Sequence, residues 1–115
     1  MNKEYEGIVD TMKEKLQMKI KARGITYVTD EDLNDEISDA IDAVNERRRF
    51  EPTPSTPFEK KYTSLIVKLA LASITKYGAE GEKSHSENGI GRNYDTAGEY
   101  PEALLSRIVP LAKAR

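Results

Sequence analysis

The chain has 115 residues, of which 33% are charged and 37% hydrophobic, and its formal net charge is −2. This length suits one domain with a modest core, and the charge balance excludes a polycation that binds nucleic acid through its overall charge. The absence of cysteine excludes a disulfide framework, a thiolate zinc site and a cysteine nucleophile. We therefore expect a single domain over residues 1–115.

Neither a signal peptide nor a membrane span is expected. The first ten residues, MNKEYEGIVD, contain no long apolar stretch. The most apolar run, Leu65 to Ile74, has about half the length that a membrane-spanning helix requires, and it contains Lys68. The composition favours a cytosolic protein with no membrane segment.

Two amphipathic helices are expected in the N-terminal half. The first covers residues 3–23, and Gly24 suits the position that follows a helix end. The second begins at a Thr29 or Asp30 cap, and residues 30–46 carry eight acids and no base. The expected apolar positions are Tyr5, Ile8, Val9, Met12, Leu16 and Ile20 in the first helix and Leu33, Ile37, Ala40, Ile41 and Val44 in the second.

A proline-rich linker, EPTPSTP at residues 51–57, separates the second helix from the third. The segment TPFE at residues 56–59 matches a capping box with proline at the first helical position. This pattern predicts a third helix over residues 57–77 that is apolar around most of its circumference, forms the centre of the fold and ends at Gly78.

A fourth helix is expected from Pro101, with Leu104, Leu105, Ile108 and Val109 facing the core and Pro110 ending or kinking it. The sequence thus predicts an all-α fold, a small bundle of about four helices with a long irregular loop at residues 78–98 between helices 3 and 4. Loops of that length in compact domains are usually functional or disordered.

Two short motifs resemble ligand-binding sequences but lack essential members. The segment GEKS at residues 81–84 resembles the end of a phosphate-binding P-loop, yet a glutamate separates its glycine from its lysine. The segment DEDLN at residues 30–34 matches the first ligand positions of a calcium-binding EF-hand loop, but Asp35 and Ile41 stand where that loop needs Gly and Glu. We expect no cofactor and no metal ion.

His85 is the only histidine, and three glutamates lie near it in the sequence. A lone histidine with scattered carboxylates, and without a nucleophile beside an orienting partner, makes a weak candidate for a catalytic or metal site. We expect no catalytic residue, so the sequence predicts a protein that is not an enzyme.

Basic residues gather where the second helix ends and the third begins. Residues 47–76 carry seven bases and two acids, and such a patch is able to bind phosphates. The neighbouring acidic helix and the proline-rich linker argue against sequence-specific reading of DNA. A small DNA-binding or DNA-packaging accessory protein is the alternative interpretation, and its candidate patch is Arg47, Arg48, Arg49, Lys60 and Lys61.

The C-terminal half carries a more specific pattern. It runs from the apolar helix with Lys68-Leu-Ala-Leu-Ala, through the loop YGAEGEKSHSENGIGRNYD at residues 77–95, to the Pro-led amphipathic segment YPEALLSRIVP at residues 100–110. Over residues 65–110 this pattern resembles the head–tail connector family of tailed phages, a family also described as phage DNA-packaging proteins.

The resemblance implies a structural virion protein of a phage or prophage. Such proteins assemble as a ring of about a dozen subunits, and a closed ring requires two complementary faces on each subunit. The ring docks below the portal protein after packaging, completes the head, extends the DNA channel and receives the stopper or tail-completion protein. DNA passes without sequence-specific binding. The implied location is the virion head–tail interface, and the host cytoplasm during assembly.

Two sets of residues are the candidates for this role. The acidic face of the second helix, Asp35, Asp39 and Asp42, is expected to line either the channel or the contact between subunits. The loop is expected to contact the portal or a neighbouring subunit, because its glycines permit irregular backbone and its charges permit recognition. Its candidate residues are Gly78, Glu80, Gly81, Glu82, Ser84, His85, Ser86, Glu87, Gly89 and Arg92.

Overall fold

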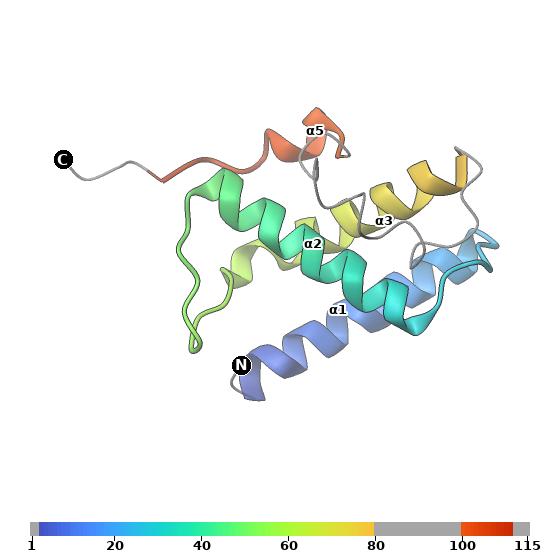
Figure 1. Cartoon of the computed structure of the whole chain (residues 1–115), viewed down its shortest axis with the longest axis horizontal. Helices are drawn as coiled ribbons and strands as arrows, with labels where there is room; N and C mark the ends of the chain where they lie inside the picture. Colours follow the sequence, from blue (N-terminus) through green and yellow to red (C-terminus); the bar gives the residue numbers. More distant parts are fainter. Residues whose placement is uncertain (1–2, 80–99, 112–115) are drawn as a thin grey trace.

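The structure is a computed structural model that describes residues 3–79 and 100–111. These residues form four α-helices and one 3-10 turn, without any strand in the two described ranges (Figure 1). In chain order the elements are α1 (Lys3–Ala22), α2 (Asp30–Arg48), η1 (Lys60–Tyr62), α3 (Thr63–Ala79) and α5 (Glu102–Leu105). The all-α prediction is confirmed, whereas residues 80–98 of the expected loop lie outside the described ranges.

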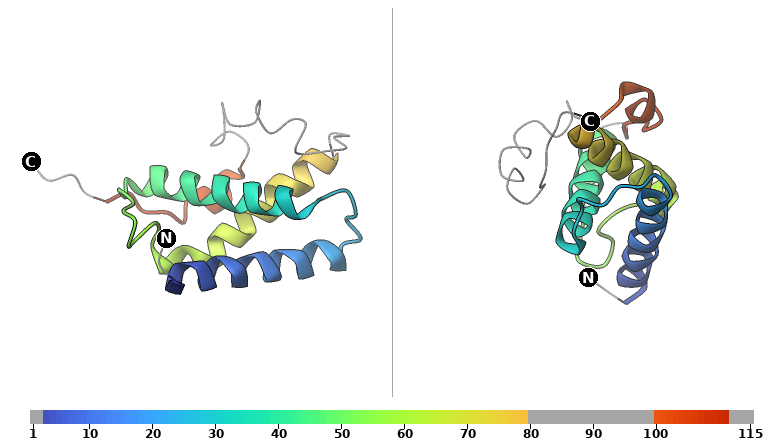
Figure 2. Two further views of the ribbon diagram at one scale, coloured as in Figure 1. Left: turned by 60° about the horizontal axis from the view of Figure 1, so that its bottom comes forward. Right: turned by 90° about the vertical axis from the view of Figure 1, so that its right-hand side faces the viewer.

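The three long helices pack against one another, and α3 contacts both α1 and α2. The end-on view places α2 and α1 on opposite sides, with α3 completing the triangle (Figure 2, right). The core between them is formed mainly by Tyr5, Met12, Leu16, Ile20, Leu33, Ile37, Ala40, Val44, Phe58, Ile66, Leu69, Ala70 and Ile74. The apolar stripes expected for α1 and α2 therefore face this core, although Ile8, Val9 and Ile41 are only partly buried against it.

The ends of α1 and α2 follow from local chemistry. Gly24 has φ +72°, a left-handed conformation that glycine adopts without steric cost, and it follows α1. Thr29 caps α2 through a reciprocal capping box, in which its hydroxyl accepts from the Asp32 N–H and the Asp32 carboxylate accepts from the Thr29 N–H. The sequence predicted the end of α1 within one residue and gave Thr29 as one of two candidate caps for α2, but it did not predict the capping box with Asp32.

The start of α3 differs from the prediction. Residues 57–59 precede η1 and are not helical, so the helix does not begin at Pro57. Phe58 is fully buried and packs edge-to-face on Tyr5 with ring centroids 4.9 Å apart, and Glu59 has an extended backbone (φ −88°, ψ 128°). The Glu59 carboxylate pairs with Arg48 instead of completing a capping box. Tertiary contacts thus override the local helix signal.

The C-terminal segment is also less helical than expected. The helix α5 has four residues and ends at Leu105, well before Pro110. Leu105 and Ile108 are buried as predicted, but Val109 is 63% exposed, so its assignment to the core was wrong. The chain leaves the helix to run beside the end of α2, where the Leu111 N–H donates to the Arg48 carbonyl at 2.8 Å.

No helix among the described residues is both long enough and apolar enough to cross a bilayer.

Candidate functional site

The candidate loop falls almost entirely outside the described residues. Only Gly78 is described, and it lies within α3, which runs to Ala79, two residues beyond the predicted last residue Tyr77, so the prediction that Gly78 ends this helix was wrong. Glu80, Gly81, Glu82, Ser84, His85, Ser86, Glu87, Gly89 and Arg92 lie in the range 80–99, outside the described residues. The loop assignment stays a prediction.

The acidic face of α2 lies on the side opposite the core. Asp35 and Asp42 are exposed and Asp39 is half-buried. The 3.6-residue period places all three opposite the buried positions Leu33 and Ile37. The same period adds two exposed carboxylates, Glu31 and Glu46, that the sequence analysis did not include. We call the five residues Glu31, Asp35, Asp39, Asp42 and Glu46 the acidic stripe.

The other acids of α2 do not belong to this surface. Asp32 is 1% exposed and serves the helix cap, and Glu36 is fully buried. Tyr27 lies near Glu36, and both burial and this carboxylate raise the pKa of the Tyr27 hydroxyl, which donates to the Ile74 carbonyl at 3.0 Å. The negative charge that the sequence spreads over 30–46 is therefore divided between a structural interior and an exposed stripe.

The surroundings of Asp42 in the acidic stripe shift its pKa. Desolvation against the bundle surface, and the Glu46 carboxylate one turn further on, raise the pKa of Asp42 above its ordinary value of 3.8. At Asp42 the ionised form is thus disfavoured, first by desolvation and then by repulsion from Glu46. A positive partner would relieve that repulsion.

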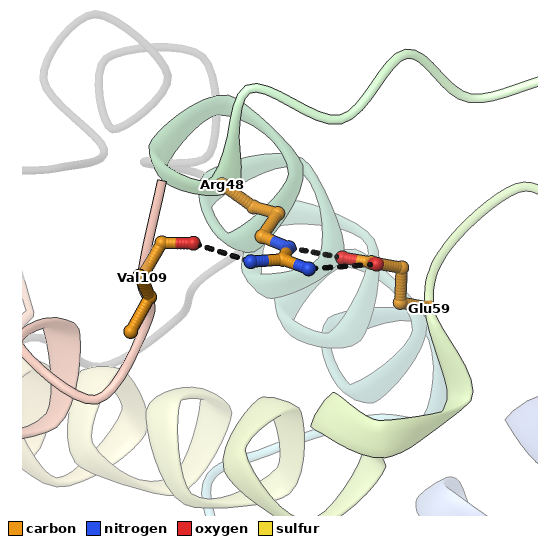
Figure 3. Close-up of polar contacts among 3 residues, drawn as sticks. All are labelled: Arg48, Glu59 and Val109. Carbon is orange, nitrogen blue, oxygen red and sulfur yellow. Dashed lines mark hydrogen bonds and ion pairs between the residues drawn. The ribbon is translucent and has the colours of Figure 1, made fainter. Parts of the chain in front are cut away.

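Arg48 connects three parts of the chain (Figure 3). Its Nε and Nη2 atoms donate to the two Glu59 carboxylate oxygens at 2.8 and 3.3 Å, and its Nη1 donates to the Val109 carbonyl at 2.6 Å. The guanidinium also lies 5.8 Å from the centroid of the Tyr62 ring. The hydrogen bond with Glu59 raises the pKa of Arg48, so the arginine stays charged while it holds the end of α2, the linker and the C-terminal segment together.

Two further bases of the candidate patch have carboxylate partners. Arg47 pairs with Glu102 of α5 at 2.7 Å, and Lys60 pairs with Glu4 of α1. The Glu4 carboxylate raises the pKa of Lys60, so this lysine also stays charged.

The remaining two bases have different environments. Lys61 lies over the Tyr62 ring at 5.5 Å from its centroid, and Arg49 is exposed at the α2 C-cap with φ 63°. With Arg47, Arg48 and Lys60 committed to carboxylates, most of the charge in the patch serves intramolecular contacts.

A basic groove between α1 and α3 was not anticipated. One end, with a volume of about 370 Å³, is lined by Lys15, Met18, Lys19, Thr63, Ser64, Val67 and Lys68. The other end, of about 480 Å³, shares Lys68 and lies where α3 meets Arg23, just after α1, and Leu104 of α5. Its lining is completed by Leu71, Ala72, Thr75 and Lys76 of α3. The four-residue spacing of Lys15, Lys19 and Arg23 was the sequence signal for one side of this groove. Only the packing of α1 beside α3 brings them together with Lys68 and Lys76.

Comparison with known proteins gives no assignment: no family model, no curated protein and no solved structure matches this chain. Within the described ranges, no group of three or more histidine or acidic side chains is placed to hold a metal ion. The functional argument therefore depends on the charged surfaces and on the sequence pattern.

Proposed function

We propose that the protein is a structural subunit of a phage or prophage head–tail connector, which forms a ring between the portal and the tail. The observation that carries this proposal is the pattern of residues 65–110, in which an apolar helix, a glycine- and glutamate-rich loop and a Pro-led segment follow one another as in that family. In this role the protein completes the head and extends the DNA channel, and it performs no catalysis.

The shape and charge of the bundle support this proposal. A ring is built from head-to-tail contacts, so each subunit needs two different faces that complement each other. The acidic stripe on α2 and the basic groove between α1 and α3 are two such surfaces. The channel is the alternative place for this stripe, and a negative surface suits it because it does not bind the phosphates of the moving duplex.

The DNA-binding alternative has weaker support. At three of the five bases in the Arg47–Lys61 patch, a phosphate would have to displace Glu102, Glu59 or Glu4, which those bases already hold. We therefore favour an assembly role for the protein over a role in binding DNA through this patch.

The test is the size of the protein, alone and with the portal protein of the same phage. Size-exclusion chromatography with light scattering is expected to show either a ring of many subunits or stable co-migration with the portal, and electron microscopy should show an annulus. A monomer that ignores the portal and instead shifts duplex DNA at low salt would contradict the proposal.

A further inference from the structure

We propose that subunits join by placing the acidic stripe of one copy in the basic groove of the next copy. The acidic stripe is Glu31, Asp35, Asp39, Asp42 and Glu46 on α2, and the groove is the one between α1 and α3. This inference rests on the proposed function, because it names the contact through which the ring would form.

The groove carries charge that the described fold does not use. Lys15 and Lys19 lie four residues apart on α1, Arg23 follows four residues later just after the helix end, and Lys68 and Lys76 line the groove from α3. None of these five bases forms an ion pair with another residue in the ranges 3–79 and 100–111, whereas Arg47, Arg48 and Lys60 all do. Five bases thus border a groove that can receive five acids.

The two surfaces also match in length. The acidic stripe extends from Glu31 to Glu46, which spans about 22 Å at the helical rise of about 1.5 Å per residue. The groove follows α3 from Thr63 to Lys76, which spans about 20 Å by the same rise. A helix laid along the groove would bring successive carboxylates to bases on both of its sides.

The lining of the groove favours a protein over a nucleic acid. Met18 is 70% exposed at one end, beside Val67, and Leu71 and Leu104 line the other. An apolar side chain at that exposure is stabilised by burial against the aliphatic parts of another protein's side chains. A phosphate has no apolar surface with which to bury it. The occupant that the chain itself supplies is the α2 helix of a second copy.

The placement of the two surfaces makes the contact propagate. The stripe lies on the outer side of α2, and α1 lies on the other side of the bundle (Figure 2, right). A subunit therefore cannot close the contact on itself, and two subunits that make it once leave one stripe and one groove open. Such a contact is heterologous and gives a ring or a filament, not a closed dimer.

The experiment uses two charge-reversal variants of the full chain. The groove variant is Lys15→Glu/Lys68→Glu, and the stripe variant is Asp35→Lys/Asp42→Lys. Assembly is measured by light scattering at low salt, for the protein alone and with the portal protein. Each variant alone is expected to lose self-association by on the order of tenfold or more, because each double reversal lowers the net charge of its surface from five units to one and places like charges opposite each other at two positions.

Mixing the two variants supplies the decisive observation. In the mixture the native stripe of the groove variant meets the native groove of the stripe variant. Where the two reversed surfaces meet, the introduced lysines of one protein face the introduced glutamates of the other. The mixture is expected to assemble with the two proteins alternating. Misfolded variants would not regain assembly in this way, so recovery separates a lost contact from a lost fold.

Matched controls change the same amount of charge elsewhere on α1. Lys3→Glu/Lys21→Glu matches the groove variant and Asp10→Lys/Glu14→Lys matches the stripe variant, since all four side chains are exposed and none lines the groove. Both controls are expected to assemble as the native protein does.

The outcomes distinguish this inference from the proposed function. Native assembly that neither reversal weakens, or variants that fail to recover on mixing while circular dichroism shows native helix content, would overturn the contact and leave the connector function standing. Self-association that follows the charges but gives open filaments without an annulus, and without any binding to the portal, would support the contact and contradict the function. A native monomer that binds duplex DNA through Lys15 and Lys68 would overturn both.

Discussion

At the scale of single residues, Arg48 holds the bundle together in a way that its charge alone does not explain. Its planar guanidinium makes two bonds to Glu59 and a third to the Val109 carbonyl, and its side chain is only 12% exposed. Lysine keeps the charge but lacks this fork of donors. We predict that Arg48→Lys lowers the melting temperature, measured by circular dichroism.

The neighbouring arginine is the control for that prediction. Arg47 pairs with Glu102, but the two side chains are 39% and 70% exposed, and exposed pairs contribute little. Arg47→Lys is therefore expected to leave the melting temperature almost unchanged. Equal losses from the two substitutions would show that Arg48 acts only as a charge.

Asp42 predicts a dependence of stability on pH. Its folded pKa is raised above the ordinary value of 3.8, so the folded protein holds this proton more tightly than the unfolded chain does. The carboxylate therefore costs no stability below its ordinary pKa and destabilises the fold once the pH exceeds the folded pKa. We predict that Asp42→Asn raises the melting temperature at neutral pH and has no such effect near pH 3, about one unit below the reference pKa of aspartate.

A second substitution tests the cause of that shift. The Glu46 carboxylate is the smaller of the two causes of the raised Asp42 pKa. Its removal takes away part of the penalty for ionising Asp42, so Asp42→Asn is expected to stabilise the protein less in a Glu46→Gln background. A gain that is the same at every pH would mean that the benefit comes from something other than ionisation.

Sequence alone identifies which residues are charged, but it assigns them roles less well. Asp32, Asp35 and Glu36 look alike in an acidic helix, yet the first and third are buried and the second is exposed. The distinction depends on which face of α2 meets the core and how wide the contact is. Likewise Arg48 and Arg49 are adjacent, and only the folded path of residues 59 and 109 commits the first to internal bonds.

At the scale of elements, Gly7 within α1 and Gly24 after it are expected to respond in opposite ways to substitution by alanine. Gly7 lies within α1, and an added Cβ would meet no atom within 4 Å, so Gly7→Ala should stabilise the fold by about 0.5–1 kcal/mol through helix propensity. Gly24 has φ +72°, so Gly24→Ala should destabilise it by about 1 kcal/mol or more. Urea unfolding measures both, and the same sign for both would contradict the assigned end of α1.

The elements were predictable wherever their signals are local. The cap at Thr29 and the left-handed residue at Gly24 concern neighbours along the chain, so the sequence predicts them. The start of α3 was misplaced because Phe58 is drawn into the core beside Tyr5 and Glu59 is taken by Arg48. Those partners are distant in sequence, and no capping rule contains them.

At the scale of the whole molecule, the charge is nearly balanced but separated onto two sides. The net charge of −2 conceals an acidic stripe on α2 and a basic groove between α1 and α3. The sequence indicated the acidic surface because its acids all lie on one helix. It could not reveal the second, because Lys15 and Lys68 meet only when α1 packs beside α3.

This separation predicts that self-association depends on salt. Exposed charges interact over about 10 Å at 0.1 M salt but over only about 3 Å at 1 M. If the stripe and the groove form the contact, assemblies seen by light scattering at low salt should dissociate as sodium chloride approaches about 1 M, where that screening is nearly complete. Sucrose is the control, because it changes osmolarity without screening charge and favours burial. Assemblies that salt strengthens would instead indicate an apolar contact centred on side chains such as Met18, and the acidic stripe would then be free to face the DNA channel.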